Sequence, residues 1–362
     1  MNTINIIGSG INGMLSAHEL HKKGFEVTIF DRQNAAQEST WAGGGIISPL
    51  FPWRYDDSIT ELSLLSQSIY PNILEELKVH SDIDPELLHS GMLMLDCKDK
   101  AQARQWKKQF SITLEEIEGQ SIQQQFNALN KNFEHAFWMP QIHQIRNPRF
   151  AQLMLESLKK QGIKIKENTE ISAFNIDSNH IRSVSTNHGD FSADKTLVCA
   201  GAWSGDLINT LQCDDESSVE INPVHGQMLL LKLDKPIFSP IILHDGRYII
   251  PRKDGHVLVG STTEMIGFKK QTTKAVRESL MEYAIQTIPQ LKDAPIVNHW
   301  SGLRPGSVKG IPKISQHPRI NNLYINAGQY RNGLVTAPGS AQLITQIICN
   351  SKTSINSQAF AL

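Results

Sequence analysis

The sequence predicts an α/β fold in which a nucleotide-binding domain is interrupted by an antiparallel, β-rich domain of the α+β type. Residues 4–31 read as a strand, a glycine turn, a helix and a second strand, whereas residues 219–262 are extended and β-rich. A length of 362 residues exceeds the usual size of one core. We therefore expect a discontinuous nucleotide-binding domain over 1–85, 145–220 and 300–362, and a substrate domain over 86–144 and 221–299.

Composition narrows the class of protein. The formal net charge of −1 offers no attraction for nucleic acid or an anionic membrane. The four cysteines lie far apart without a C-x-x-C pair, which argues against a disulfide framework or a metal site and favours a cytoplasmic protein. No stretch approaches about 18 uninterrupted apolar residues, so we expect neither a membrane span nor a signal peptide.

The first element is typical of a dinucleotide-binding unit. Gly8, Gly10 and Gly13 form a G-x-G-x-x-G turn between a buried strand and a helix. Gly8 permits the tight turn, Gly10 leaves room for a pyrophosphate, and Gly13 lets helix and strand pack closely. The helix N-terminus offers N–H groups to the phosphates. Asp31 ends the second strand, where a carboxylate can bind ribose hydroxyls.

A second glycine-rich stretch, ESTWAGGGIISPLFPWRY, occupies residues 38–55. Glycine is costly to order, so the run Gly43 to Gly45 indicates that another group approaches the backbone closely. The large apolar residues beside the run argue against a solvated surface loop. Two backbone-lined loops so near each other favour FAD over NAD, because FAD is long enough to lie along both.

The remaining chain predicts alternating helices and strands. The expected elements are a helix over 60–79 with its apolar spacing broken near Pro71, a strand over 92–95, a helix over 149–164, a strand over 163–165, a strand and helix over 195–208, a helix over about 274–291 and a strand over 323–326. Asp254-Gly255 marks a hairpin turn within the β-rich region.

A series of motifs spans nearly the whole chain: GSGING, STWAGGGIISP, CAGAWSG, NPVHGQ, RYIIPRKDGHVLVGST, WSGLRPG and GQYRNGLVTAP. Each motif alone is common, but their order and spacing resemble the D-amino-acid-oxidase-type family of FAD-dependent oxidoreductases. The resemblance is strongest to its glycine oxidase and D-amino-acid dehydrogenase branches. It implies a Rossmann-like FAD-binding domain of the two-dinucleotide-binding type, with the antiparallel substrate domain inserted.

The resemblance implies a set of FAD-contacting residues. They are Gly8, Gly10, Ile11, Asn12, Gly13, Asp31, Arg32, Ser39, Thr40, Gly44, Gly45, Ile46, Ile171, Ala200, Gly201, Gln329, Tyr330, Arg331, Asn332, Gly333, Leu334 and Val335. Among these, Ile171 would contact the adenine end, and residues 329–335 would offer N–H groups to the flavin. The segment RPGSVKGIPK contains no cysteine where related sarcosine oxidases attach their flavin, so we expect non-covalent FAD.

The resemblance also implies the substrate-binding residues. Arg304 matches a carboxylate-binding arginine, a role that suits its planar guanidinium. Tyr248 matches a tyrosine that assists on the same group, and Arg331 matches a position near substrate and flavin. Each has a structural alternative: an ion pair for Arg304, a strand face for Tyr248, and a bridge near a helix start for Arg331. No catalytic side chain is expected beyond the flavin.

The predicted reaction is oxidative deamination of glycine or a small D-amino acid, with hydride transfer to flavin N5. It would give an imino acid, then a 2-oxo acid and ammonia, and O2 as acceptor would form hydrogen peroxide. One alternative is a dehydrogenase that passes electrons to a quinone or another acceptor, and another is a flavin-binding module without turnover. The resemblance links the activity to thiamine biosynthesis and leaves self-association as a homo-oligomer open.

Two departures from glycine oxidases leave the substrate side chain open, from glycine to larger D-amino acids. Gly246 stands where those enzymes carry a histidine, and Ile46 stands where they carry a methionine. The tip Trp53–Tyr55, stiffened by Pro49 and Pro52, is expected to lie over the pocket mouth with Arg54 as a solvated charge.

Overall fold

The chain begins with the expected βαβ unit. The computed structural model describes residues 2–211 and 218–362, so Cys213 lies outside the described residues. β1 (Thr3–Ile7) and β2 (Glu26–Phe30) pair in parallel, with α1 (Ile11–Lys22) between them in the chain. The strand, glycine turn, helix and second strand predicted over residues 4–31 are confirmed.

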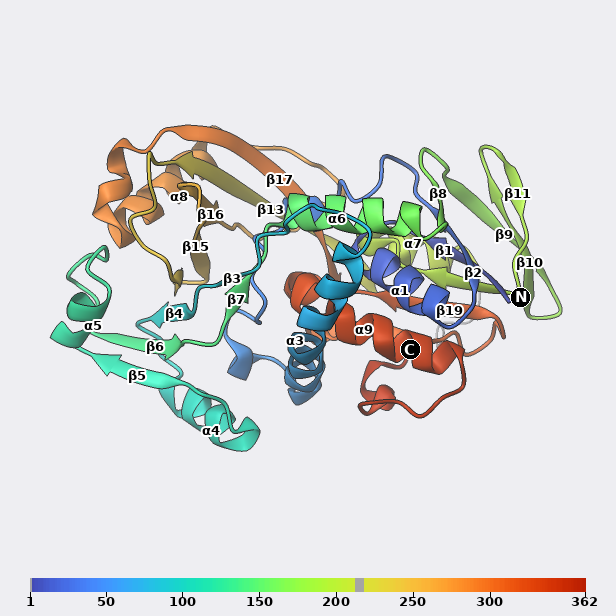
Figure 1. Cartoon of the computed structure of the whole chain (residues 1–362), viewed down its shortest axis with the longest axis horizontal. Helices are drawn as coiled ribbons and strands as arrows, with labels where there is room; N and C mark the ends of the chain where they lie inside the picture. The colour runs from blue at the N-terminus through green and yellow to red at the C-terminus, as the bar shows by residue number, and fades with distance from the viewer. Residues whose placement is uncertain (1, 212–217) are drawn as a thin grey trace.

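Strands from distant parts of the chain join this unit in a six-stranded sheet with the order β18-β19-β12-β1-β2-β8. The added strands are β8 (Lys164–Lys166), β12 (Lys195–Val198), β18 (Lys313–Gln316) and β19 (Leu323–Ala327). All neighbours pair in parallel except β18, which is antiparallel to β19 at one edge. This mostly parallel sheet is Rossmann-like and gathers the start, middle and end of the chain (Figure 1).

Long helices pack together on this sheet. α9 (Gly333–Ile348) packs against α1 and against α3 (Asp57–Lys78), and α6 (Asn147–Lys160) packs beside both α1 and α3. The core that they share with the sheet contains fully buried aliphatic side chains, among them Ile6, Leu15, Leu62, Leu153 and Leu343. Along α6 the buried residues recur at the helical period, as Phe150, Leu153 and Met154 do, so this helix buries one face. By contrast α1 and α9 are buried nearly all round.

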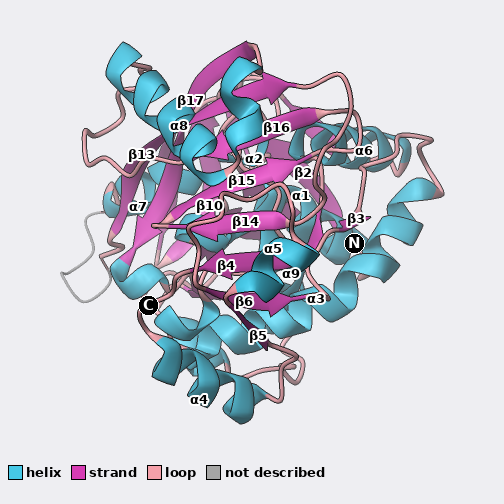
Figure 2. Ribbon diagram, turned by 90° about the vertical axis from the view of Figure 1, so that its left-hand side faces the viewer, coloured by secondary structure: helices cyan, strands magenta, loops and turns pink. Residues whose placement is uncertain are grey.

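The β-rich region forms an eight-stranded sheet with the order β17-β13-β16-β15-β14-β4-β6-β5 (Figure 2). Its strands are β4 (Met92–Leu95), β5 (Glu115–Glu118), β6 (His135–Met139), β13 (Ile221–Lys232), β14 (Ile241–His244), β15 (Arg247–Pro251), β16 (His256–Gly260) and β17 (Ile296–Ser307). Neighbours are antiparallel except β14 and β4, so the predicted antiparallel sheet is confirmed in its main feature.

The two faces of this sheet have different partners, as the alternation of a β-strand requires. On β15, Ile249 faces a core that includes Leu280 and Ala284 of α8 (Lys274–Thr287). Tyr248 and Ile250 belong to the core on the opposite face, which includes the residues after the glycine run. The sheet therefore presents Tyr248 toward the six-stranded domain.

The shorter elements complete the chain. They are α2 (Ser39–Ala42), η1 (Pro52–Arg54), β3 (Leu88–His89), α4 (Lys100–Phe110), α5 (Gln120–Gln125), β7 (His143–Gln144), β9 (Ile171–Asp177), β10 (His180–Thr186), β11 (Gly189–Phe191), η2 (Gly201–Trp203), α7 (Ser204–Asn209), η4 (Pro289–Asp293), η5 (Val308–Gly310), η6 (Tyr330–Asn332) and η7 (Ser357–Phe360). None of the helices in the described ranges has the length and apolar character needed to cross a bilayer.

Two features differ from the expectations. The apolar spacing of helix α3 is not broken near Pro71, because the buried residues Tyr70, Ile73 and Leu74 recur at the helical period across it. Strand β17 pairs with β13 along its whole length and so crosses the domain boundary expected at residue 300. The division into the FAD-binding segments 1–85, 145–220 and 300–362 and the substrate segments 86–144 and 221–299 stays a prediction.

Candidate functional site

Two adjoining cavities meet at the glycine turn after β1: the first lies between this turn and the eight-stranded sheet, and the second lies between this turn and the start of β9. The first reaches from the start of α1 to Tyr248 and Arg304. The second reaches from the same turn to Asp31 and Ile171. They share lining residues at Gly10, Ser39, Thr40, Cys199 and Gly201. Together they form one elongated space, which fits an extended dinucleotide rather than a compact ligand.

The glycine turn after β1 is shaped by close packing on one side and by open space on the other. Gly8 has φ +106°, and a Cβ there would lie 2.3 Å from the Cys199 carbonyl oxygen. A Cβ on Gly13 would lie 1.9 Å from the Gly8 carbonyl oxygen. Gly10 is different, because its Cβ would meet only Thr40 Oγ1, at 3.3 Å, and would otherwise enter the cavity. This room beside a helix N-terminus is what a pyrophosphate needs.

Asp31 supports this turn from the end of β2. Its Oδ2 accepts hydrogen bonds from the Ser9 backbone N–H at 2.9 Å and from Ser9 Oγ at 2.5 Å, and its Oδ1 accepts one from Gln33 N at 3.0 Å. The carboxylate therefore fixes the turn, and it also lines the second cavity. Beside it, the Arg32 guanidinium lies 3.7 Å from the centre of the Trp203 ring.

The glycine run is enclosed on several sides, which explains its composition. A Cβ on Gly43 would lie 2.7 Å from Asn147 Nδ2, and one on Gly44 would lie 2.8 Å from Ile250 Cδ1. Gly45 has φ +83°, and a Cβ there would lie 1.9 Å from the Ile145 carbonyl oxygen. Any side chain would push the loop away from β15 and α6. The close approach expected from the sequence thus includes the protein's own backbone.

Arg304 carries a charge that faces the cavity without a carboxylate partner among the described residues. Its Nη2 donates to Ser261 Oγ at 2.6 Å, and its Nη1 donates to the Thr262 carbonyl oxygen at 3.2 Å. Burial lowers the pKa of the Arg304 guanidinium. The guanidinium lies over Gly226, where a Cβ would come within 2.3 Å of Nη1. The alternative of an ion-pair arginine is therefore contradicted.

Tyr248 and Arg331 line the same cavity. The Tyr248 hydroxyl donates to Met228 Sδ at 3.5 Å, a weak acceptor. Arg331 Nη2 donates to Thr263 Oγ1 at 2.8 Å, while its buried Nε has no acceptor in the described part of the chain. Two guanidiniums and a phenol hydroxyl thus converge on a space beside Gly44, and this arrangement suits a small anion.

The structure places most of the residues expected at the FAD site on one of the two cavities. The first cavity is lined by Gly10, Ile11, Asn12, Ser39, Thr40, Gly44, Gly45, Ile46, Gly201, Gln329, Tyr330, Arg331, Gly333 and Leu334. The second is lined by Gly8, Gly10, Asp31, Arg32, Ser39, Thr40, Ile171, Ala200 and Gly201. Three of the expected residues line neither cavity, namely Gly13, Asn332 and Val335.

Several lining residues were missed by the sequence reasoning. Ser261 binds Arg304, and Trp203 stacks on Arg32. Ser261 lies in the motif RYIIPRKDGHVLVGST and Trp203 lies in the motif CAGAWSG. The sequence assigned roles to other residues of these motifs, namely Tyr248 in the first and Ala200 and Gly201 in the second. A serine or tryptophan shows which way its side chain points only once its strand or turn is placed.

The tip of the 38–55 stretch differs from the expectation. Trp53 is only 9% exposed, packs against Trp106 and Phe137, and lines neither cavity. Arg54 is exposed, as expected for a solvated charge, but it is also paired: its Nε and Nη2 donate to the two carboxylate oxygens of Asp99 at 2.5 and 2.9 Å. The tip is thus bonded to Asp99, directly before α4, and Trp53 does not cover the pocket mouth.

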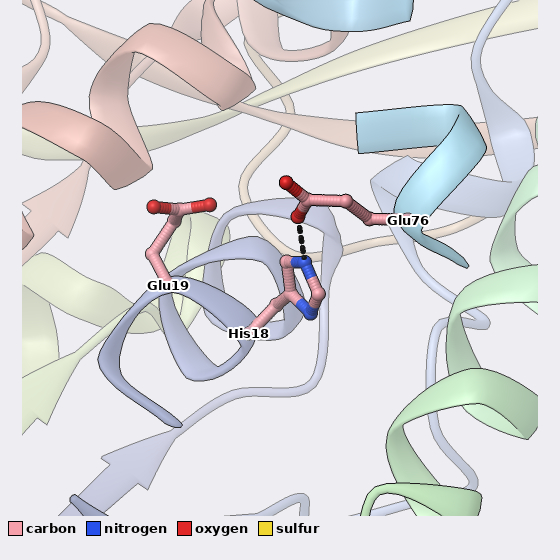
Figure 3. Close-up of side chains that lie close together, drawn as sticks. All are labelled: His18, Glu19 and Glu76. Atoms are coloured by element: carbon pink, nitrogen blue, oxygen red, sulfur yellow. Dashed lines mark hydrogen bonds and ion pairs between the residues drawn. The ribbon is translucent and has the colours of Figure 1, made fainter. Parts of the chain in front are cut away.

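One group of potential metal ligands occurs among the described residues, and it lies away from both cavities. His18, Glu19 and Glu76 lie close together, and His18 Nε2 contacts Glu76 Oε2 at 2.8 Å (Figure 3). Lys22 Nζ is 2.7 Å from the same Glu76 oxygen and 3.4 Å from Glu19 Oε1. The lysine ammonium already supplies the positive charge that the carboxylates require, so nothing in this group calls for a metal.

Comparisons with known proteins agree with this geometry. The family profile described as FAD dependent oxidoreductase matches residues 3–347. The chain is 38% identical over 357 residues to glycine oxidase of Pseudomonas aeruginosa, covering 98% of this chain and 97% of that protein. It is 26% identical to the bifunctional protein ThiO/ThiG of Trichormus variabilis, covering 97% of this chain and 53% of that protein. The crystal structure of glycine oxidase from Geobacillus kaustophilus shares the fold, with a TM-score of 0.93, 23% identity and coverage of 100% of this chain and 99% of that one.

Gly10→Leu is expected to abolish retention of FAD, because the new side chain would fill the space beside the helix N-terminus. Released flavin, measured by absorbance after acid precipitation of purified protein, would fall below a tenth of the parent's flavin content. Gly24→Asn is the matched control, since a Cβ there meets nothing within 4 Å. Normal FAD content in the Gly10 variant would show that this turn does not hold the pyrophosphate.

Trp53→Ala is expected to destabilise the protein rather than change which amino acid it prefers. Loss of a buried tryptophan from this aromatic cluster typically costs about 3–5 kcal/mol. Chemical denaturation monitored by circular dichroism would measure the loss. A parent-like unfolding midpoint combined with a reordered substrate preference would show instead that Trp53 contacts the substrate.

Proposed function

The chain belongs to the family of FAD-dependent oxidoreductases, and from that premise we propose that it oxidises glycine or another small D-amino acid. As a member of this family it is an FAD-dependent enzyme that acts on amines. The finer assignment rests on its similarity to proteins named glycine oxidase and on the chemistry of the first cavity.

The observation that carries the proposal is the cavity-facing Arg304 without a carboxylate partner. A partly buried guanidinium is costly to desolvate, and an anion that enters the cavity would offset that cost. A substrate carboxylate has the planar geometry that a guanidinium binds with two parallel hydrogen bonds. Tyr248 stands on the same wall and would donate to the same carboxylate, while Arg331 would add a second positive charge.

Other residues of the chain would hold the cofactor and orient the substrate. The start of α1 and the Gly44–Ile46 loop would hold FAD non-covalently, with Asp31 and Ile171 at its far end. When bound, FAD supplies the chemistry by accepting a hydride from the substrate α-carbon. The protein fixes the carboxylate at Arg304, and this sets the orientation of the α-carbon. The described residues of the cavity include no acid positioned to protonate the substrate amine.

We also propose that the substrate is small. Tyr248 and Ile250 approach Gly44 closely, and this narrows the space beside the glycine run. Gly246, the position expected to widen the pocket, lies in the turn between β14 and β15 and lines neither cavity among the described residues. The loss of a side chain at Gly246 therefore leaves the walls of this cavity unchanged.

O2 as the electron acceptor and a link to thiamine biosynthesis belong to the same proposal. The similarity to proteins named glycine oxidase favours an oxidase. The similarity to a bifunctional protein named ThiO/ThiG supports the biosynthetic link. A dehydrogenase that uses a quinone is the second candidate, because Arg304 and Tyr248 would bind the amino acid in the same way with either acceptor.

Arg304→Ala is expected to retain FAD but to raise the glycine concentration needed for half-maximal anaerobic flavin reduction by at least tenfold, since a charge-assisted pair contributes about 1.5–3 kcal/mol. Stopped-flow absorbance measures this reduction. Arg304→Lys should recover only part of the loss, because an ammonium lacks the planar fork. Arg247→Ala is the control, since Arg247 binds Ser279 and lines neither cavity. Parent-like reduction by the alanine variant would make Arg304 structural.

Glycine, sarcosine and D-alanine are expected to reduce the flavin faster than D-phenylalanine does, and L-amino acids should not reduce it. After anaerobic reduction by glycine, admission of air should reoxidise the flavin with one hydrogen peroxide formed per flavin, measured by a peroxidase-coupled dye. Slow reoxidation in air with rapid reoxidation by a soluble quinone would select the dehydrogenase. Reduction by L-amino acids alone would contradict the stereochemical proposal.

A further inference from the structure

A buried arginine outside the substrate site holds the glycine run in place. Arg252 follows β15 directly and is only 3% exposed. Its Nη2 donates to the Gly44 carbonyl oxygen at 2.9 Å. Its Nη1 donates to Gln144 Oε1 at 2.6 Å and to the Ile145 carbonyl oxygen at 3.1 Å. One guanidinium thus joins the eight-stranded sheet, β7 and the glycine run.

The partners of Arg252 are all neutral oxygen atoms, which is unusual for a buried charge. The nearby carboxylates of Glu86 and Asp254 are bonded to Arg146 at 3.1 and 2.8 Å. Burial lowers the pKa of Arg252 to about 10, so the guanidinium stays charged at neutral pH. A hydrophobic side chain or an uncharged amide could fill this position at a lower desolvation cost, so the charge itself calls for an explanation.

The Gln144 amide is oriented so that its oxygen accepts from this arginine. Its side-chain Nε2 donates to Ser90 Oγ at 2.7 Å and to the Pro251 carbonyl oxygen at 2.9 Å. With both amide hydrogens engaged, its Oε1 can point only toward Arg252. Gln144 is 1% exposed, so the pair is a fixed part of the interior.

The bond from Arg252 to Gly44 determines where the next N–H group points. In a planar trans peptide the carbonyl oxygen and the following N–H lie on opposite sides. Because the Gly44 carbonyl oxygen faces Arg252, the Gly45 N–H points away from it, and Gly45 lines the first cavity. No acceptor for this N–H occurs among the described residues. It is thus a backbone donor without an acceptor in the described part of the chain, on a residue that lines the cavity.

We propose that Arg252 is a positioning residue of the FAD site, which turns the Gly45 N–H toward the flavin and strengthens it as a hydrogen-bond donor. A cation bonded to the carbonyl oxygen of a peptide polarises that peptide and makes its N–H a better donor. The same buried charge favours the electron-rich, reduced state of the flavin over the oxidised state. The inference rests on FAD binding and is independent of which amino acid is the substrate.

The test is Arg252→Met, which keeps the length of the side chain but removes its charge and its donors. The FAD dissociation constant, from quenching of flavin fluorescence in titrations of apoprotein, should rise at least tenfold. The midpoint potential of the bound flavin should become more negative, and its visible absorption bands should shift. Arg247→Met is the matched control, because Arg247 lies on β15, the strand that Arg252 follows, binds Ser279 and lines neither cavity. It should leave potential and spectrum unchanged.

Arg252→Lys provides a second variant if the methionine protein fails to fold. An ammonium keeps the charge but cannot reach all three oxygen atoms in the geometry of the guanidinium. Its FAD affinity and spectrum should lie between those of the parent and the methionine variant. A folded Arg252→Met or Arg252→Lys protein with the parent's dissociation constant, potential and spectrum would overturn the proposal, whatever the outcome of the substrate experiments.

Discussion

The architecture depends on the close packing of the glycine run against α6 and the eight-stranded sheet. Gly43, Gly44 and Gly45 pass within contact distance of Asn147, Ile250 and the Ile145 carbonyl oxygen, leaving no room for a side chain at any of the three. The same loop is bonded to the glycine turn after β1, because Thr40 Oγ1 accepts from the Ile11 N–H at 2.9 Å. A backbone without side chains can therefore form part of the wall of the first cavity.

The two cavities differ in charge. Arg304 donates only to neutral oxygen atoms, and so does Arg331 in the described part of the chain, so the first cavity carries uncompensated positive charge and favours a carboxylate. The second cavity is instead lined by acidic side chains, namely Asp31, Glu38, Glu170 and Asp206, beside Arg32. A carboxylate there can accept from the hydroxyl groups of a ribose.

The differences between expectation and structure have a common origin. Trp53 is expected over the pocket mouth, yet Asp99, directly before α4, and Trp106 of α4 come from elsewhere in the chain to contact its ring. The apolar spacing is expected to break near Pro71, yet Tyr70, Ile73 and Leu74 continue it in the core. In each case a long-range contact outweighs a local preference, and such a contact leaves no mark on the segment itself.

The sequence by itself determined the βαβ unit, the antiparallel character of the β-rich region and the family, because glycines with fixed roles and period-two alternation are local patterns. It also named Arg304 and Tyr248, by resemblance. Only the tertiary structure decided that Arg304 faces a cavity without a carboxylate partner, that Gly246 does not line it, and that Arg252 holds the glycine run. Those facts depend on which strands become neighbours, and pairing between residues more than a hundred positions apart is set by the packing of the whole core.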